Sequence, residues 1–466
     1  MASVPPATQP RREATILVTA GSVLLRQILR LAAPTTSLAL LQVVAQLVET
    51  WLAARQGTAA LAGWAVLLPF ALLMQQMSTG AMGGGVVSAI ARALGAERRD
   101  EAAALVSHAL VIAVTAGLVF AVGVSLLSRP MLGAIAGPES AGAATGYALW
   151  LFGVGAVPTW LTNTYASVLR GGGRHALAAR VLTLVWGVYP VLGWALAEPA
   201  GMGLAGVGAA FAIVSWLAAG AMAWVVQRGG AGFTVTISLR TSAELFKRIL
   251  AVGAVACTLA AVANLTTILV TAQLRGYGTA AVAGYGVAAR LEFLVIPLSF
   301  GIGSALTALV GRAVGAGDWP TARRTAWIGG GLAFGVTAAL GLGVAVFALP
   351  FAELFTGDPE VARIAARALG ITGPAFGAFG LGMALYFASM GAGRMAWPVV
   401  AGLSRLFIAV AGGTWLATHT GLGMDGYFLG VALGIASYGL FTACGVRAAN
   451  WRPRSLGAVP PRALAP

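Results

Sequence analysis

The sequence of 466 residues has very little charge. Only 9% of its residues are Asp, Glu, Lys or Arg, whereas a soluble domain carries about 25%. Apolar residues make up 59%, and the mean hydropathy is +0.87. So few charges cannot cover the surface of a soluble protein of this length. The composition therefore excludes a soluble globular protein. It predicts an all-α integral membrane protein that crosses the bilayer many times.

Cysteine and histidine are also scarce. The two cysteines, Cys257 and Cys444, fall in apolar runs, which excludes a disulfide scaffold and predicts buried thiols. The three histidines, His108, His175 and His419, are far apart and lack the spacing of metal ligands. No nucleophile and base stand together either. The sequence therefore predicts no metal site, no cofactor and no enzyme activity.

Acidic residues are half as common as basic ones, 14 against 29, and 28 of the basic residues are Arg. The arginines are scattered through short loops, which is typical of positive-inside topology and not of nucleic-acid binding. With both termini in the cytoplasm, the side across the membrane receives few of them: Arg55, Arg129, Arg275, Arg363 and Arg367. Arg290 is expected to be the only one within a span. We expect a multi-pass protein of the inner (plasma) membrane with a retained N-terminal tail.

Twelve apolar runs are long enough to cross the hydrocarbon core, which takes about 20 residues. They lie at 31–53, 62–87, 104–127, 146–169, 178–197, 204–227, 248–272, 280–309, 325–349, 367–390, 397–418 and 427–446. An even number of spans places both ends of the chain on one side of the membrane.

The two halves of the chain repeat each other. GTAALAG (57–63) returns as GTAAVAG (278–284), an offset of 221. Three further pairs share an offset of 220: RALGA (92–96) with RAVGA (312–316), GGGR (171–174) with GAGR (391–394), and GMGLAG (201–206) with GLGMDG (421–426). Six spans in each half make this a parallel repeat, typical of transporters with two lobes.

The repeat divides the chain into predicted units. These are a cytoplasmic tail (1–30), an N-lobe of six helices (31–228), a linker on the cytoplasmic surface (229–246), a C-lobe of six helices (247–447) and a second tail (448–466). The repeated segments GMGLAG (201–206) and GLGMDG (421–426) fit the pattern G-x-G-x-x-G. They follow no strand and precede apolar spans, so they do not indicate a dinucleotide site.

Only two carboxylates lie within spans, Glu49 and Glu292. A charge inside the bilayer is costly, so both are candidates for ion coupling. Gln42, Gln46 and Glu49 share one helix face, where a carboxyl group can exchange a proton near neutral pH. The alternative for Glu49 is a side chain that reaches the outer interface. Arg290 is two residues from Glu292, so the two side chains point to different sides of the helix. For Glu292 the alternative to ion coupling is a structural ion pair between helices.

Other intramembrane polar residues are candidates for lining a substrate cavity. The full set is Gln42, Gln46, Gln75, Asn163, Tyr189, Asn264 and Arg290. Hydrogen bonds between helices are the common alternative use of such residues. Aromatic residues such as Trp64 offer walls for flat or cationic substrates.

Several segments resemble the multidrug and toxic compound extrusion (MATE) family over roughly residues 30–450. The matching features are Pro34, Glu49 with Thr50, the turn GTAALAG, the segment 296–327 with its glycine pattern, and the small-residue loops at 169–174 and 390–394. The resemblance implies two V-shaped six-helix bundles that expel amphipathic, often cationic compounds in exchange for protons or sodium.

In that resemblance, Glu49 stands where family members carry a first-helix Asp tied to ion coupling. The seventh-helix and tenth-helix acids of the sodium-coupled branches are missing, because their places fall near Ala263-Asn264 and Phe379. The fifth-helix Asn-x-x-x-Asp-Pro of some branches appears here as Val185 to Tyr189-Pro190, without the acid. We therefore expect a monomeric proton antiporter with Glu49 as the carrier, Glu292 as second choice, sodium less favoured, and different roles for the two lobes.

Four rival functions each require a feature that can be compared with this sequence. A flippase for a lipid-linked saccharide would line its cavity with basic residues, which only Arg290 offers. A major-facilitator antiporter shares the 6+6 repeat but has a different loop after its second span. A membrane-embedded enzyme would need a catalytic cluster at one face. A scaffold without transport activity would reveal itself by the absence of flux.

Overall fold

The structure is a computed structural model, and it describes residues 9–235, 241–447 and 451. In these residues the chain forms helices and no strand. The first half contains α1 (Gln9–Arg55), α2 (Thr58–Gln75), α3 (Met82–Gly95), α4 (Arg99–Ala148), α5 (Ala156–Gly171), α6 (His175–Trp186), α7 (Tyr189–Ala197) and α8 (Gly203–Val225). The second half contains α9 (Ala243–Gln273), α10 (Thr279–Gly315), α11 (Trp319–Val346), α12 (Ala348–Glu353), α13 (Pro359–Thr372), α14 (Phe376–Ala392), α15 (Ala396–Phe407), α16 (Gly413–His419) and α17 (Met424–Gly445).

Short segments of other helix types join some of these helices. Four are π-helical, η1 (Gln76–Ala81), η2 (Leu149–Val154), η3 (Val226–Gly230) and η6 (Ile408–Gly412), and two are 3-10 turns, η4 (Leu274–Tyr277) and η5 (Gly373–Ala375). Because such turns interrupt the regular spacing of side chains, they shift which residues face a neighbouring helix.

Eleven helical segments of the described chain are long and apolar enough to cross a membrane. One of them, Arg99–Val154, has 56 residues, which is about 84 Å of helix and far more than one crossing needs. It bends at Gly137, whose φ of 88° is non-helical, and then runs back along itself: Gly117 lies against Val157, and Gly153 lies against Ser125. The eleven segments therefore hold twelve crossings, as the sequence predicts.

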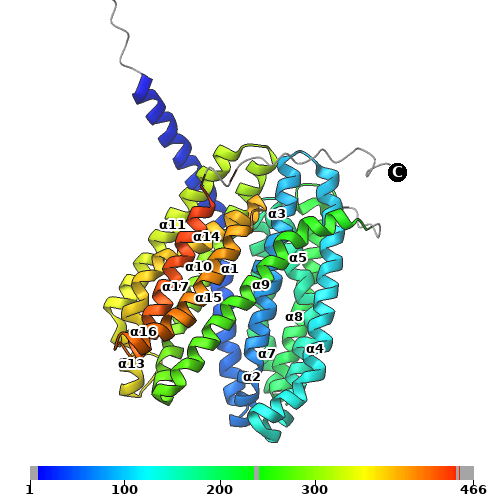
Figure 1. Cartoon of the computed structure of the whole chain (residues 1–466). Helices are drawn as coiled ribbons and strands as arrows, with labels where there is room; N and C mark the ends of the chain where they lie inside the picture. Colours follow the sequence, from blue (N-terminus) through cyan, green and yellow to red (C-terminus); the bar gives the residue numbers. More distant parts are fainter. Residues whose placement is uncertain (1–8, 236–240, 448–450, 452–466) are drawn as a thin grey trace, which may run out of the picture.

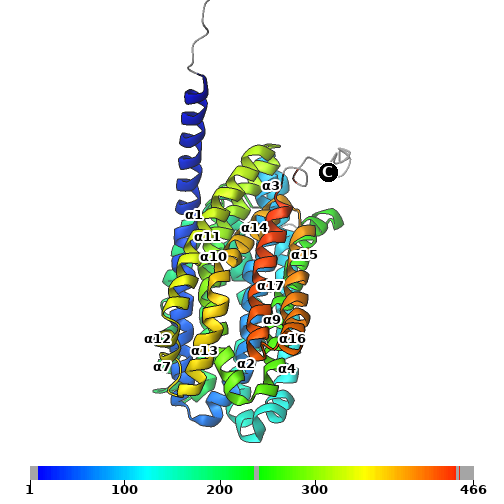
Figure 2. The ribbon, with the colours of Figure 1, turned by 60° about the vertical axis from the view of Figure 1, so that its left-hand side comes forward.

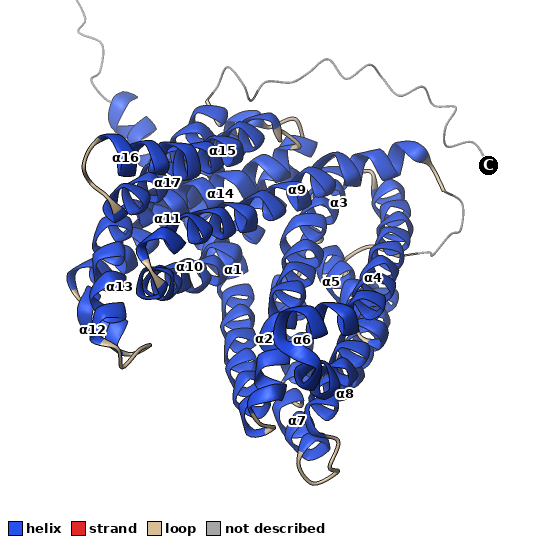
Figure 3. Ribbon diagram, turned by 60° about the horizontal axis from the view of Figure 1, so that its bottom comes forward, coloured by secondary structure: helices blue, strands red, loops and turns tan. Residues whose placement is uncertain are grey.

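The helices form two lobes, with α2 to α8 in one and α10 to α17 in the other, and α1 and α9 between them (Figures 1 and 3). The lobes meet at the end that carries both termini and diverge at the opposite end, as in a V. We call the first end the arginine-rich end, because Arg98, Arg174 and Arg394 lie in its loops 96–98, 172–174 and 393–395. At this end α1 extends beyond the bundle (Figure 2).

The repeated motif GTAALAG/GTAAVAG has the same structural use in both lobes. Its first glycine, Gly57 or Gly278, has a φ of 100° or 95° and begins a helix at the end opposite the arginine-rich end. Its last glycine packs that helix against a neighbour. A Cβ on Gly63 would overlap Ala144 of α4, and a Cβ on Gly284 would lie 2.7 Å from Ile364 of α13. Ala144 and Ile364 are themselves related by the offset of 220, so the contact is repeated too.

The ends of the predicted units fall partly outside the described residues. Of the predicted linker, 236–240 is not described, and its last residues already belong to α9, which begins at Ala243. Helix α1 begins at Gln9, within the predicted tail 1–30. Of the predicted tail 448–466, the structure describes Trp451, whose carbonyl accepts a 3.0 Å hydrogen bond from Arg323.

Candidate coupling site

Glu49 of α1 lies at the centre of a group of aromatic hydrogen-bond donors. Its Oε1 accepts a 3.0 Å hydrogen bond from the Trp64 indole and another from the Tyr147 hydroxyl. Its Oε2 accepts a 2.9 Å hydrogen bond from the Tyr189 hydroxyl. The three aromatic side chains are 5%, 1% and 2% exposed, and Glu49 is half-buried. We call these four residues the Glu49 cage.

Four helices supply the cage at similar depth. Glu49 lies six residues from the end of α1, Trp64 six residues from the start of α2, and Tyr189 eight residues from the end of α7. Tyr147 lies ten residues beyond the bend at Gly137. At 1.5 Å per residue, all four are about 9–15 Å from the end opposite the arginine-rich end. They therefore lie between about one and three helical turns from the helix ends and at similar depth in the bundle.

Close helix packing holds the aromatic members in place. Tyr189 contacts Trp186 and Phe211 edge-on, with ring centroids 5.7 and 6.2 Å apart. Helix α8 approaches Tyr147 through Gly208, where a Cβ would lie 2.8 Å from the Tyr147 carbonyl oxygen. Helix packing thus fixes the positions of Tyr147 and Tyr189 independently of their hydrogen bonds to Glu49.

The chemistry of the cage suits an ionised carboxylate. All three partners donate, and a carboxylate is an acceptor with room for about four hydrogen bonds. Hydrogen bonds to a charged acceptor are the strong ones. A protonated carboxyl group must donate one bond itself; a tyrosine hydroxyl can turn and accept it, whereas the indole N–H cannot.

A second polar group surrounds η1 in the second span. Asn163 of α5 donates to Gln75 Oε1 at 3.0 Å and to Ser78 Oγ at 2.8 Å. Gln76, which follows Gln75 in the chain, accepts a 3.1 Å hydrogen bond from Asn264 of α9. The π-helical turn thus directs two adjacent glutamines to partners in different halves of the chain. Three of the predicted cavity residues, Gln75, Asn163 and Asn264, take part in these interhelical bonds.

The remaining predicted residues lie apart from these two groups. Gln42 and Gln46 are half-buried on α1, on the arginine-rich side of Glu49. Arg290 of α10 is exposed, and its guanidinium lies 5.6 Å from the ring centre of Phe355. The side chain of Glu292 lies outside the described residues.

The expectation that Arg290 is the only basic residue within a span is wrong. Arg405 lies ten residues inside the segment Ala396–His419, and its guanidinium is 5.2 Å from the ring centre of Phe379. The residue also falls within the predicted eleventh span, 397–418, where a single basic residue barely lowers the hydropathy of a long apolar run.

Tyr147 is the member of the cage that the sequence analysis missed, and Trp64 appeared there only as a possible wall. Both residues look like ordinary interface aromatics in the sequence. The available signal was depth: topology alone places Glu49, Trp64 and Tyr147 at matching distances from the same membrane face. In the part of the chain that the structure describes, no three His, Cys, Asp or Glu residues gather in a way that could hold a metal ion.

Comparison with known proteins identifies the family. A sequence model of the family described as MatE matches residues 34–195 and again residues 253–415. The two matches begin 219 residues apart, close to the offset of the repeats, and cover more than half of the chain. The chain belongs to the MATE family.

Relatives and solved structures agree with the MATE assignment. The chain is 29% identical over 421 residues to a protein named "Probable multidrug resistance protein NorM" from Rhodopseudomonas palustris, covering 85% of this chain and 86% of that one. The Vibrio cholerae MATE transporter VcmN in its bent form matches with a TM-score of 0.84 at 24% identity, covering 93% of this chain and 100% of VcmN. A structure described as the outward-facing conformation of a multidrug resistance MATE family transporter gives 0.84 at 22% identity, covering 91% and 96%.

MATE membership fixes the broad activity. The chain is a multi-pass membrane transporter that extrudes small molecules, and it is not an enzyme. The Glu49 cage lies in the first of the two MatE matches. The offset of the repeats gives it no counterpart in the second, because the positions that repeat Glu49, Tyr147 and Tyr189 hold Leu269, Arg367 and Ala409.

Proposed function

We propose that this MATE transporter exports amphipathic, cationic compounds in exchange for protons, with Glu49 as the group that carries the proton. The observation that carries the proposal is the cage itself: an intramembrane carboxylate that accepts hydrogen bonds from three donors. The names of the curated relatives, which are multidrug resistance proteins, support the substrate class.

The donors favour a proton over sodium as the coupling ion. A hard cation requires several oxygen ligands that converge on it. Trp64 presents an N–H to Glu49 Oε1, so the positive end of that dipole occupies a direction from which a cation would approach. A proton needs only one oxygen, and the tyrosine hydroxyls can turn to accept it.

Proton exchange at Glu49 would change the packing of four helices at once. The ionised form is satisfied by all three donors, while the neutral form must release the indole or reorient a tyrosine. Because the donors come from α2, α4 and α7, each protonation state favours a different position of α1 against the N-lobe. This supplies the differential interaction that an exchange cycle requires.

We infer that the two lobes alternate access by moving against each other, and that the present state is closed at the arginine-rich end. The contacts between lobes at that end support this, and the positive-inside rule assigns it to the cytoplasm, with both termini there, in the inner membrane. We assign the N-lobe to 31–228, the C-lobe to 247–447 and the linker to 229–246, and we propose a monomer.

Arg405 favours a second candidate, a flippase for a lipid-linked saccharide. Together with Arg290 it places two basic residues inside spans of the C-lobe, and basic groups suit a phosphate. In this structure, however, the two guanidinium groups lie over the rings of Phe355 and Phe379. Since these contacts do not form a phosphate site, drug export stays the first proposal.

Efflux of a fluorescent organic cation from cells under an imposed pH gradient tests the proposal, with sodium present or absent. We expect gradient-dependent, sodium-independent efflux, and its loss by at least about tenfold in Glu49→Gln, because a neutral amide cannot carry a proton. Glu139→Gln is the matched control: it removes an exposed carboxylate from the same lobe and should leave efflux unchanged.

Two outcomes would overturn the proposal. Full proton-driven efflux in Glu49→Gln would exclude Glu49 as the carrier. Absence of efflux from the unmodified protein, together with scrambling of a lipid-linked saccharide that Arg405→Gln abolishes, would favour the flippase.

A further inference from the structure

The two lobes cross at the arginine-rich end in a nearly two-fold arrangement. A Cβ on Gly95 of α3 would overlap the backbone carbonyl of Arg312, and a Cβ on Gly315 of α10 would overlap that of Arg92. Both pairs are related by the offset of 220. Helices α3 and α10 therefore touch backbone to backbone, once from each side.

Each arginine of this crossing reaches a glycine loop of the opposite lobe. Arg312 donates a 3.0 Å hydrogen bond to the carbonyl of Gly172, and its guanidinium lies 3.7 Å from where a Cβ of Gly173 would be. Arg92 lies directly against Gly393, the position that repeats Gly173. The loops at 171–174 and 391–394, which the repeat singled out, are the receiving surfaces for these two side chains.

The junction beneath the crossing is tightly packed. Arg170 lies 5.6 Å from the ring centre of Phe300 across the junction and is 3% exposed. The space that these residues enclose with Ser304 is about 10 Å³, which is room for about one water molecule. A substrate cannot pass unless this end separates.

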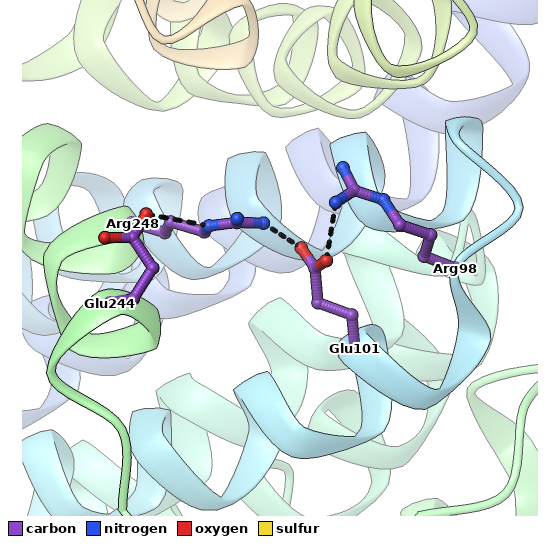
Figure 4. Close-up of polar contacts among 4 residues, drawn as sticks. All are labelled: Arg98, Glu101, Glu244 and Arg248. Carbon is purple, nitrogen blue, oxygen red and sulfur yellow. Dashed lines mark hydrogen bonds and ion pairs between the residues drawn. The ribbon is translucent and has the colours of Figure 1, made fainter. Parts of the chain in front are cut away.

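Charge breaks the symmetry at one place, where α9 docks on α4 (Figure 4). Glu101 of α4 binds Arg98 at 2.7 Å and also binds Arg248 of α9, and Arg248 binds Glu244 of its own helix at 3.4 Å. The side chains of Glu101 and Arg248 are only 14% and 24% exposed. Arg92 lies within electrostatic reach of both.

On the opposite side of the junction, the two positions that repeat Glu101 and Arg248 carry no charge. The position that repeats Arg248 is Ile28 of α1, which is buried with Ile302 and Ala305 of α10. The position that repeats Glu101 is Thr321, whose backbone N–H binds Asp318. At the position that repeats Arg248, α1 thus packs on the second lobe through an apolar side chain, whereas α9 binds the first lobe through an ion pair.

A neighbouring histidine fixes the start of α9 at the same place. His108 of α4 accepts a 2.8 Å hydrogen bond from the backbone N–H of Ser242 through Nε2, which assigns the proton to Nδ1 facing the Ala104 carbonyl. Its ring also contacts Phe246 edge-on at 4.7 Å. Near its other end, α9 belongs to the second lobe, since Gln273 donates to Thr414 at 2.8 Å. Opening of the arginine-rich end must therefore either detach the start of α9 from α4 or bend the helix.

We propose that the Glu101–Arg248 pair is an ionic latch that holds the arginine-rich end closed and must break before that end can open. The latch rests on one part of the proposed function, the alternate opening of this end, and not on the exported substrate or the coupling ion. In Figure 4, Glu101 is the carboxylate that joins the two halves of the chain: it binds Arg98 and Arg248, and Arg92 lies within its electrostatic reach. Its neutralisation replaces an attraction by repulsion among three arginines.

A buried cysteine reporter measures opening without any transport assay. Ser304→Cys is nearly isosteric and 4% exposed in the unmodified chain, and we would place it in a background with Cys257→Ala and Cys444→Ala. The probe is a small maleimide added to inside-out vesicles. We expect slow labelling with the latch intact and a rate about tenfold higher in Glu101→Gln, as for the loss of one partly buried ion pair.

Three variants make the test specific. Glu244→Gln removes a carboxylate from Arg248 within one helix and should leave the rate unchanged. Arg248→Gln should raise it as Glu101→Gln does, and serves if that variant does not fold. Exchange of the charges, Glu101→Arg with Arg248→Glu, should restore part of the protection. Raised ionic strength should speed labelling of the intact latch and not of Glu101→Gln, a response that loss of packing would not produce.

The outcomes separate the latch from the export proposal. If Glu101→Gln and Arg248→Gln label within twofold of the parent, or if Glu244→Gln opens the junction equally, the latch is wrong even if drug efflux is proton-driven. If the parent shows no efflux but the labelling pattern holds, the export proposal fails and the latch stands.

Discussion

The residues of the Glu49 cage differ in what their polar atoms can do. The hydroxyls of Tyr147 and Tyr189 both donate and accept, so they can serve either protonation state of the carboxyl group. The Trp64 indole only donates, at 3.0 Å from Oε1. Among the three donors, Trp64 is therefore the one that cannot accept the carboxyl proton, and this difference from the two tyrosines holds Oε1 as an acceptor in both protonation states.

The expected effect of Trp64→Phe follows from that difference. The change removes one hydrogen bond to a charged acceptor while keeping most of the ring, and we expect proton-driven efflux to fall by about tenfold. Trp194→Phe, at a 47% exposed site on α7, is the control and should have no effect. Equal rates in both variants would show that the indole has no part in coupling.

At the scale of helices, close approach positions the site. Gly63 directly precedes Trp64, and the contact of α2 with α4 at Gly63 and Ala144 brings Trp64 within reach of Glu49 and Tyr147. A larger side chain at this position must push the helices apart. The same helix contact recurs at Gly284, in the lobe where Leu269 occupies the position that repeats Glu49.

Gly63→Leu should therefore affect both stability and function. We expect overpacking to destabilise the protein by about 1–3 kcal/mol and to lower efflux, because the donor moves off the carboxylate. Thermal unfolding in detergent and the efflux assay measure the two effects. Gly123→Leu on α4, where a Cβ would meet nothing within 4 Å, is the matched control. A loss of equal size there would refute the packing argument.

At the scale of the whole molecule, the two ends of the bundle are tied differently. At the arginine-rich end the ties join the lobes, as the Arg312–Gly172 hydrogen bond and the Glu101–Arg248 pair do. At the opposite end, two ion pairs each tie one lobe to itself. Arg55 binds Glu198 at 2.9 Å in the first lobe, and Arg367 binds Asp425 in the second. The Arg55 hydrogen bond lowers the pKa of Glu198, so this tie persists at neutral pH.

The near two-fold crossing predicts that its two glycines are equivalent. Gly95→Val and Gly315→Val should each separate α3 from α10 and speed labelling of the Ser304→Cys reporter by similar factors, about tenfold. Gly331→Val on α11, where a Cβ would meet nothing within 4 Å, should label like the parent. A strong effect at one crossing glycine and none at the other would contradict the two-fold arrangement.

The sequence predicted the architecture well because that architecture depends on composition and periodicity. Low charge, twelve apolar runs and an offset of 220 follow from the demand that every span be apolar and that each half fold alike. The candidate site was predicted less completely. Glu49 was found because a lone carboxylate in an apolar run is conspicuous, whereas Tyr147 was not, since an aromatic residue in such a run has many uses.

The sequence by itself determined that the chain is a helical membrane transporter with a parallel repeat, because hydropathy, arginine placement and repeated motifs are local properties of the chain. Only the tertiary structure decided which polar side chains meet. Glu49 and Tyr147 are 98 residues apart, and Glu101 and Arg248 are 147 apart. Hydrogen bonds and ion pairs at such separations depend on how helices cross and on where a π-helical turn rotates one face, and neither leaves a periodic signal in the sequence.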